Sequence, residues 1–289
     1  SGSGTISTGQ IDNGTSDACG IASLSLDRTS FDCTDIGQQT VTLTAVDNNG
    51  NSSSCTAIVT VMDNIPPTAV CQNITLPLDV NGMATITPLD IDGGSTDFCG
   101  ITSRSIDVNS FDCSNIGANS VVLTVTDGSG NTNSCTAIVT VVDTTPPIAS
   151  CQNITINLDA TGSAFIQASD IDAGSTDACG IASISLSNTI FNCSQVGSNS
   201  VILTVTDTSG NSSFCTAIVT VQDVTAPTVN CQDITVTLDE SGVAFISEID
   251  IDAGSFDACG LSLLTLDQTT FTCDDIGANT VTLSAGDIF

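Results

Sequence analysis

Apolar and polar residues alternate along most of the chain, most clearly between residues 199 and 223. In the stretch NSVILTVTD, Val201, Leu203 and Val205 fall on one face of an extended strand. In SFCTAIVTVQD, every second residue from Cys215 to Val221 does the same. Alternation with a period of two, broken by Gly, Asn, Asp, Ser and Pro, is typical of half-buried β-strands. No segment shows a helical period, so the pattern predicts an all-β protein.

This pattern returns at a fixed interval. The loop DAGSTDACGI at 172–181 has close copies at 12–21, 92–101 and 252–261. A period of roughly 80 residues indicates an array of whole small domains rather than a solenoid of short units. We expect a partial repeat at 1–63 without its first strands, repeats at 64–143 and 144–223, and a partial repeat at 224–289 without its last strand. The chain is then a window on a longer array.

The repeat at 144–223 contains roughly seven short strands, which predicts an immunoglobulin-like β-sandwich. One strand is expected at 163–172. In the strand at 149–158 the apolar parity shifts, which predicts a bulge or a change of sheet near Gln152 and Asn153. Short Pro-containing linkers between sandwiches predict an extended rod. One phenylalanine per repeat is expected in the core: Phe31, Phe111, Phe191 and Phe271.

The charge balance limits the partners. The chain has 32 acidic residues, two arginines and no lysine or histidine, for a net charge of −30. Such a surface repels nucleic acid and anionic membranes. A hydrophobic content of 40% in strand-like runs argues against disorder. The absence of His, Lys, Tyr and Trp leaves little for catalysis, so we expect no enzyme, no nucleic acid partner and no membrane insertion.

The residues DTTPPIASCQNITINLDATG and TVTDTSGNSSFCTAIVTV resemble the HYR (hyalin repeat) family of extracellular immunoglobulin-like domains. The CQNITINLD and DIDAGSTDACG variant is similar to repeat arrays of Bacteroidota cell-surface proteins. These include SprB-type gliding-motility adhesins exported by type 9 secretion. The resemblance covers essentially the whole chain.

The resemblance implies a stalk or adhesive module at the cell surface, outside the cell. Its partners would be the neighbouring repeats of the same chain and a cell-surface or substratum ligand that the sequence does not identify. In this interpretation the repeats form the stalk of an adhesin or filament that serves surface adhesion and gliding motility. Alternatively, the repeats themselves bind a polysaccharide or a protein. The lack of Trp and Tyr counts against stacking on sugars.

Fourteen cysteines in repeated positions indicate an oxidising compartment. The first and last strands of an immunoglobulin-like domain run side by side, which predicts Cys71–Cys135 and Cys151–Cys215. A bond between sequence neighbours such as Cys135 and Cys151 is excluded, because the strand and linker carry their Cα atoms farther apart than a disulfide can span. Cys55 and Cys231 would find partners outside this window. The remaining cysteines are expected to close hairpins: Cys19–Cys33, Cys99–Cys113, Cys179–Cys193 and Cys259–Cys273.

The acidic loops have two interpretations. Asp, Asn, Gly and Ser form turns, and turn chemistry alone explains their recurrence. Calcium binding is the other interpretation, because six to eight oxygens are what that ion requires. In an immunoglobulin-like sandwich these loops meet the linker at one end, so we expect carboxylates to gather around calcium at each junction. One junction would use Asp63, Asp90, Asp92, Asp97 and Asp127, the next Asp143, Asp170, Asp172, Asp177 and Asp207, and the last Asp223, Asp250, Asp252 and Asp257.

Overall fold

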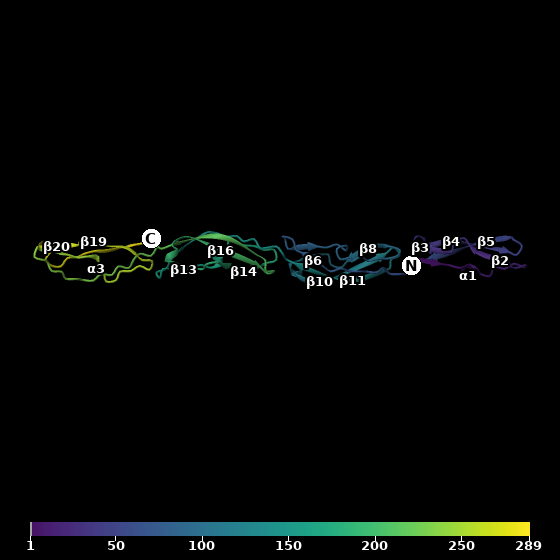
Figure 1. Ribbon diagram of the computed structural model, residues 1–289, viewed down its shortest axis with the longest axis horizontal. Coiled ribbons are helices and arrows are strands. Elements are labelled where there is room, and N and C mark those ends of the chain that lie inside the picture. The colour runs from purple at the N-terminus through teal and green to yellow at the C-terminus, as the bar shows by residue number, and fades with distance from the viewer. Residues whose placement is uncertain (1) are drawn as a thin grey trace. The chain divides into compact units, whose positions relative to one another are not determined.

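The computed structural model describes residues 2–289 and separates the chain into two compact units, Ser1–Asp143 and Thr144–Phe289. Figure 1 shows the course of the chain. Two of the four sequence repeats belong to each unit. The boundaries between repeats inside each unit stay a prediction from the period of the sequence.

Strands dominate the first unit, and single helical turns lie between some of them. Its elements are β1 (Ser3–Thr5), α1 (Thr8–Ile11), β2 (Ile21–Leu26), β3 (Ser30–Asp32), η1 (Cys33–Asp35), β4 (Gly37–Asp47), β5 (Ser52–Val61), β6 (Ile74–Pro77), β7 (Met83–Thr85), β8 (Ile101–Ile106), β9 (Ser110–Asp112), η2 (Cys113–Asn115), β10 (Gly117–Asp127) and β11 (Thr132–Val142).

The second unit is built from the same kinds of elements, but it begins with a complete repeat. Its elements are β12 (Ile154–Asn157), β13 (Ser163–Phe165), α2 (Ala168–Ile171), β14 (Ile181–Leu186), β15 (Ile190–Asn192), η3 (Cys193–Gln195), β16 (Gly197–Asp207), β17 (Ser212–Gln222), β18 (Val243–Phe245), α3 (Glu248–Ile251), β19 (Leu261–Leu266), β20 (Thr270–Thr272), η4 (Cys273–Asp275) and β21 (Leu283–Asp287).

Each complete repeat is built from a large and a small sheet. In the second repeat the large sheet has the order β6-β11-β10-β8, and β7 pairs with β9 in the small one. Strand β6 runs parallel to β11, whereas the β10 pairings are antiparallel. The third repeat has the same arrangement, with the sheets β12-β17-β16-β14 and β13-β15. The predicted immunoglobulin-like β-sandwich, with its first and last strands side by side, is confirmed.

The core of the third repeat lies on the strand faces that the alternation predicts. Val201, Leu203 and Val205 of β16 are fully buried, and they belong to one core cluster with Ala217, Val219 and Val221 of the neighbouring strand β17. Fully burying such an aliphatic side chain contributes roughly 1.5–3 kcal/mol. The four recurring phenylalanines are 0–6% exposed, which confirms their place in the core.

Two local features bear on the sequence predictions. The prediction of one strand over 163–172 is wrong beyond Phe165. The strand β13 ends there, and a single helical turn, α2, follows it. The Asp170 carboxylate caps this turn by accepting a hydrogen bond from the backbone N–H of Gln167 at 2.7 Å. The predicted change of sheet near residues 152–153 is confirmed. Cys151 bridges to Asp172, whereas Ile154 already pairs with Val219 of the large sheet.

In residues 2–289, no helix has the length and apolar character needed to cross a membrane.

Candidate functional site

Two junctions between consecutive repeats lie inside the units, one in each. In the first unit, Asp63 of the linker meets Asp97 and Cys99 of the following repeat. In the second unit, Asp223 meets Asp257 and Cys259 in the same way. In each group the carboxylate oxygens and the sulfur lie within 4.8 Å of one another, and all six residues are half-buried. We refer to these two groups as the junction clusters.

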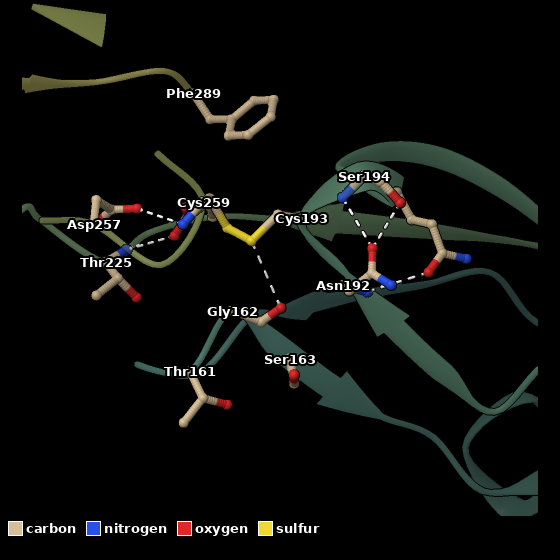
Figure 2. Close-up of a disulfide and its surroundings, with 12 residues drawn as sticks. Thr161, Gly162, Ser163, Asn192, Cys193, Ser194, Thr225, Asp257, Cys259 and Phe289 are labelled. Carbon is tan, nitrogen blue, oxygen red and sulfur yellow. Dashed lines mark hydrogen bonds between the residues drawn. A yellow bond between two sulfur atoms is a disulfide. The ribbon is translucent and has the colours of Figure 1, made fainter. Parts of the chain in front are cut away.

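Turn geometry holds each carboxylate of the second-unit junction cluster by one oxygen. Asp257 Oδ1 accepts a hydrogen bond from the backbone N–H of Cys259 at 2.7 Å, and Asp223 Oδ1 accepts one from Thr225 at 3.0 Å. Figure 2 shows Asp257, Thr225 and Cys259 beside the disulfide. Asp223 Oδ2 is buried and has no hydrogen-bond partner among the described residues. A buried carboxylate oxygen without a partner is costly unless a cation satisfies it.

The first-unit junction cluster has the same turn geometry. Asp97 Oδ1 accepts a hydrogen bond from the backbone N–H of Cys99 at 2.7 Å, and Asp63 Oδ1 accepts one from Ile65 at 3.0 Å. The Asn131 amide adds a link that the sequence analysis missed. Its Nδ2 donates to the Asp63 carbonyl at 3.0 Å and to Asp127 Oδ2 at 2.8 Å. Asparagine recurs every 80 residues at this position, as Asn51, Asn131 and Asn211, and this recurrence was the available signal.

A disulfide crosses each of these junctions. Cys33 of the first repeat bonds to Cys99 of the second, and Cys193 of the third bonds to Cys259 of the fourth. In both bonds the partners are 66 residues apart and their Cα atoms are separated by 5.1 Å. Figure 2 shows the Cys193–Cys259 bond. Successive repeats inside a unit are therefore covalently joined beyond the linker peptide.

The predicted hairpin disulfides are wrong. Cys33 does not bond to Cys19, Cys99 to Cys113, Cys179 to Cys193, or Cys259 to Cys273; Cys19 and Cys273 are free and exposed in the described part of the chain. The reason is that the strands flanked by these cysteines form no hairpin. Strand β8 pairs with β10 in the large sheet, whereas β9 pairs with β7 in the small one.

The predicted bonds inside the complete repeats are confirmed. Cys71 bonds to Cys135 and Cys151 bonds to Cys215, each across 64 residues. Cys55 and Cys231 are free and exposed in residues 2–289. Their pairing with cysteines outside this window stays a prediction.

A glycine allows the second-unit junction to pack closely. Gly162 has a φ of +73°, and a Cβ built there would lie 2.7 Å from Cys193 Sγ and 3.2 Å from the Ala258 Cβ. Figure 2 shows the Gly162 carbonyl near the Cys193 sulfur; the two atoms are 3.7 Å apart. A side chain at this position would collide with the disulfide. The recurrence of glycine at this position of each repeat was a signal that the sequence analysis did not use.

Most of the other predicted carboxylates serve turns and are not in the junction clusters. Asp90 accepts from the Thr87 backbone N–H, and Asp250 from that of Ser247. These backbone hydrogen bonds lower the pKa of both carboxyls. The corresponding carboxylate of the third repeat is Asp170, whose bond to Gln167 caps α2.

The first aspartate of the recurring loop accepts a hydrogen bond from the serine three residues later in the second, third and fourth repeats. The pairs are Asp92 with Ser95, Asp172 with Ser175 and Asp252 with Ser255. Asp92 is also bound by Arg104, whose Nε donates to Oδ2 at 2.6 Å. Burial raises the pKa of Asp92, but the bonds from Ser95 and Arg104 outweigh it and lower the pKa to about 2.

The remaining predicted carboxylates lie in turns or at unit ends. Asp127 and Asp207 are 1–2% exposed and accept from Asn131 and Asn211, respectively. Burial raises their pKa, but the asparagine hydrogen bonds outweigh it and lower the pKa. Asp177 accepts from the backbone N–H of Cys179 at 2.8 Å. Asp143 is the last residue of the first unit and is 8% exposed.

The chain is similar to two curated proteins. It is 33% identical over 238 residues to hyalin of Strongylocentrotus purpuratus, which covers 76% of this chain and 19% of that protein. It is 26% identical over 242 residues to hyalin of Lytechinus variegatus, which covers 79% of this chain and 45% of that protein. The chain thus spans less than half the length of either relative. No protein-family model matches the chain.

Solved structures of cadherin domains are also similar. Extracellular domains 1–4 of protocadherin gamma B7 have 12% identity and a TM-score of 0.34, over 84% of this chain and 78% of that one. Drosophila N-cadherin EC1-4 has 15% identity and a TM-score of 0.33, over 64% of this chain and 57% of that one.

Proposed function

Because the two hyalin relatives support a hyalin-repeat-like family for this chain, we propose that it is a structural stalk segment of an extracellular adhesive protein. The observation that carries the proposal is the disulfide between successive repeats, Cys33–Cys99 in one unit and Cys193–Cys259 in the other. A binding module needs a surface for its ligand, whereas a stalk needs firmly joined repeats. Persistent disulfides also fit an oxidising location outside the cell.

The proposal assigns no catalytic step to the chain. Its role is to hold a distal adhesive region away from its anchor, as the resemblance to gliding-motility adhesins implies. In a gliding organism that makes this protein, deleting its gene is expected to abolish spreading over a surface. If the deletion strain still spreads, the role in gliding motility is contradicted, whereas the proposed stalk function is unaffected.

Ligand binding separates a stalk from a binding module. The whole chain is immobilised and probed with a glycan array, extracellular matrix proteins and whole cells. A stalk is expected to retain none of them. Saturable retention of one glycan or protein would contradict the stalk and favour the alternative, in which the repeats themselves are binding modules.

Calcium stiffening is the finer part of the proposal. The donors suit a hard cation, because each junction cluster has two carboxylates from opposite sides of a linker, and Asp223 Oδ2 has no hydrogen-bond partner among the described residues. Calcium prefers six to eight oxygens, so backbone carbonyls and water would complete its shell. The disulfide sulfurs would not be ligands. The arginine of the second repeat, Arg104, is bound to Asp92, which is not in a junction cluster.

Calorimetry of calcium binding tests this part. Asp223→Asn is expected to remove one calcium-binding event, because it replaces the carboxylate that carries the unpartnered Oδ2 with a neutral amide. Asp233→Asn is the matched control, because Asp233 is exposed in the same unit and is not in a junction cluster. If the unaltered chain shows no heat of calcium binding, or both variants bind like it, the junction carboxylates serve turns only.

A further inference from the structure

The disulfides of each unit interlock. In the first unit, Cys33–Cys99 closes one loop and Cys71–Cys135 closes another, and the loops overlap between Cys71 and Cys99. In the second unit, Cys151–Cys215 and Cys193–Cys259 overlap between Cys193 and Cys215. The overlap arises because one bond of each pair joins the first and last strands of a repeat, whereas the other crosses a junction.

This interlocking shortens the covalent path that a pulling force follows. Along the backbone, the path from Cys33 to Cys135 includes every residue of 33–135. The shortest covalent route between the same two cysteines crosses both disulfides and includes only the stretch 71–99. At roughly 3.3–3.6 Å per residue, the backbone path could extend to about 350 Å, whereas the bonded route ends at about 110 Å.

The second unit gives the same result from different residues. The backbone path from Cys151 to Cys259 includes all of 151–259, whereas the route through both disulfides includes only 193–215. The corresponding limits are about 370 Å and about 90 Å. Most of the residues that build the sandwich of each complete repeat therefore lie in closed loops that tension cannot pull out to full length.

We propose that the chain is a length-limited tether, in which interlocked disulfides prevent tension from unravelling the repeats. The biological use of this length limit rests on the proposed stalk function. The limit itself follows from which cysteines are bonded to each other. It holds even when strands separate, because it is set by covalent bonds. A stalk held only by strand pairing would reach roughly three times that limit over the same residues.

The design also tolerates the loss of one bond. Without Cys33–Cys99, the route from Cys33 to Cys135 follows the backbone over 33–71 and then crosses the remaining disulfide. Without Cys71–Cys135, the route crosses to Cys99 and follows the backbone over 99–135. Either loss moves the limit to only about 130–140 Å, so both bonds must open before the stretch lengthens fully.

Single-molecule force spectroscopy tests the proposal. The chain is held at Ser30 and Thr136, which are both exposed, through non-cysteine handles at these positions. The oxidised chain is expected to stop lengthening at about 120 Å. Chains lacking either pair, C33S/C99S or C71S/C135S, are expected to stop below about 160 Å. The quadruple variant and the reduced chain are expected to reach about 360 Å.

The decisive result is the C71S/C135S chain. If it extends as far as the quadruple variant, the bond between repeats does not form and the proposal is overturned. Extension measures connectivity and not folding, so a variant that folds poorly still reports its bonds, and mass spectrometric counting of free thiols checks them independently. The ligand-binding experiment on the immobilised chain tests the proposed stalk function alone. A retained ligand would contradict that function without changing the length limit, so the two proposals can be refuted independently.

Discussion

Removing the disulfide inside the second repeat should destabilise that repeat by an amount that its loop length sets. Cys71 and Cys135 close a loop of 64 residues. In the chain-entropy model, closing such a loop contributes about 4 kcal/mol at 25 °C. The bond to the first repeat alters the effective loop only modestly, and the dependence on length is logarithmic. The large sheet and its hydrogen bonds remain in the C71A/C135A variant.

Hydrogen exchange measured by mass spectrometry is the suitable assay, because a chain of several repeats has no single unfolding free energy. About 4 kcal/mol corresponds to a loss of protection on the order of a thousandfold at β10 and β11. The third repeat of the same molecule is the internal control, and C55A is the matched variant, because Cys55 is free and exposed. Equal protection in C71A/C135A and C55A would refute the reasoning, and so would an equal loss in the third repeat.

Trypsin, which cleaves after the two arginines, should release fragment 1–28 from the denatured, unreduced chain; retention of that fragment would restore the hairpin scheme. Gly162→Ala should destabilise the second unit by roughly 1–3 kcal/mol more than Gly174→Ala in thermal melts. Both glycines have positive φ, but only the Gly162 substitution meets the Cys193 sulfur, at 2.7 Å; equal melting would contradict the clash. Because the pKa of Asp92 falls to about 2 in the fold, its stabilisation is complete above about pH 4 and is lost as pH falls toward 2. The difference in melting temperature between the unaltered chain and Asp92→Asn should therefore shrink over that pH range. A difference that stays constant would contradict the lowered pKa of Asp92.

The strands and their buried faces could be predicted because period-two alternation is a direct record of which side chains face the core. Val201, Leu203 and Val205 illustrate this, since all three are fully buried. The parity shift around residues 152–153 even located a change of sheet. The single helical turns escaped, because one turn is too short to show a helical period.

The disulfides between repeats could not be read from the repeat pattern. Cys19 and Cys99 occupy the same position of successive repeats. A bond from Cys33 to Cys19 and a bond from Cys33 to Cys99 therefore join equivalent positions of the repeat. The sequence does not show whether the partner comes from the same repeat or from the next one. The sheet assignment decides, because β8 and β9 belong to different sheets.

The carboxylates show a second limit of sequence reasoning. Sequence reveals how many acidic groups a loop carries, but not which backbone N–H groups point at them. Asp92, for example, accepts hydrogen bonds from Ser95 and Arg104. An aspartate two or three residues before a loop N–H readily closes a turn. Asp97 and Asp257 accept such turn bonds and still lie in the junction clusters. A turn motif in the sequence therefore does not reveal which carboxylates come together at a junction.

Comparison of the two units separates features of the repeat from features of one copy. The Arg104–Asp92 ion pair occurs in the second repeat, but the position of Arg104 is Leu24, Ile184 or Leu264 in the other copies. The bond between repeats behaves differently. It recurs in both units with the same separation of 66 residues, beside a linker aspartate and a loop aspartate each time. The Arg104–Asp92 ion pair is therefore a feature of one copy and has no general role in joining repeats. The disulfide between repeats recurs together with its neighbouring aspartates, so it is part of how each repeat is joined to the next.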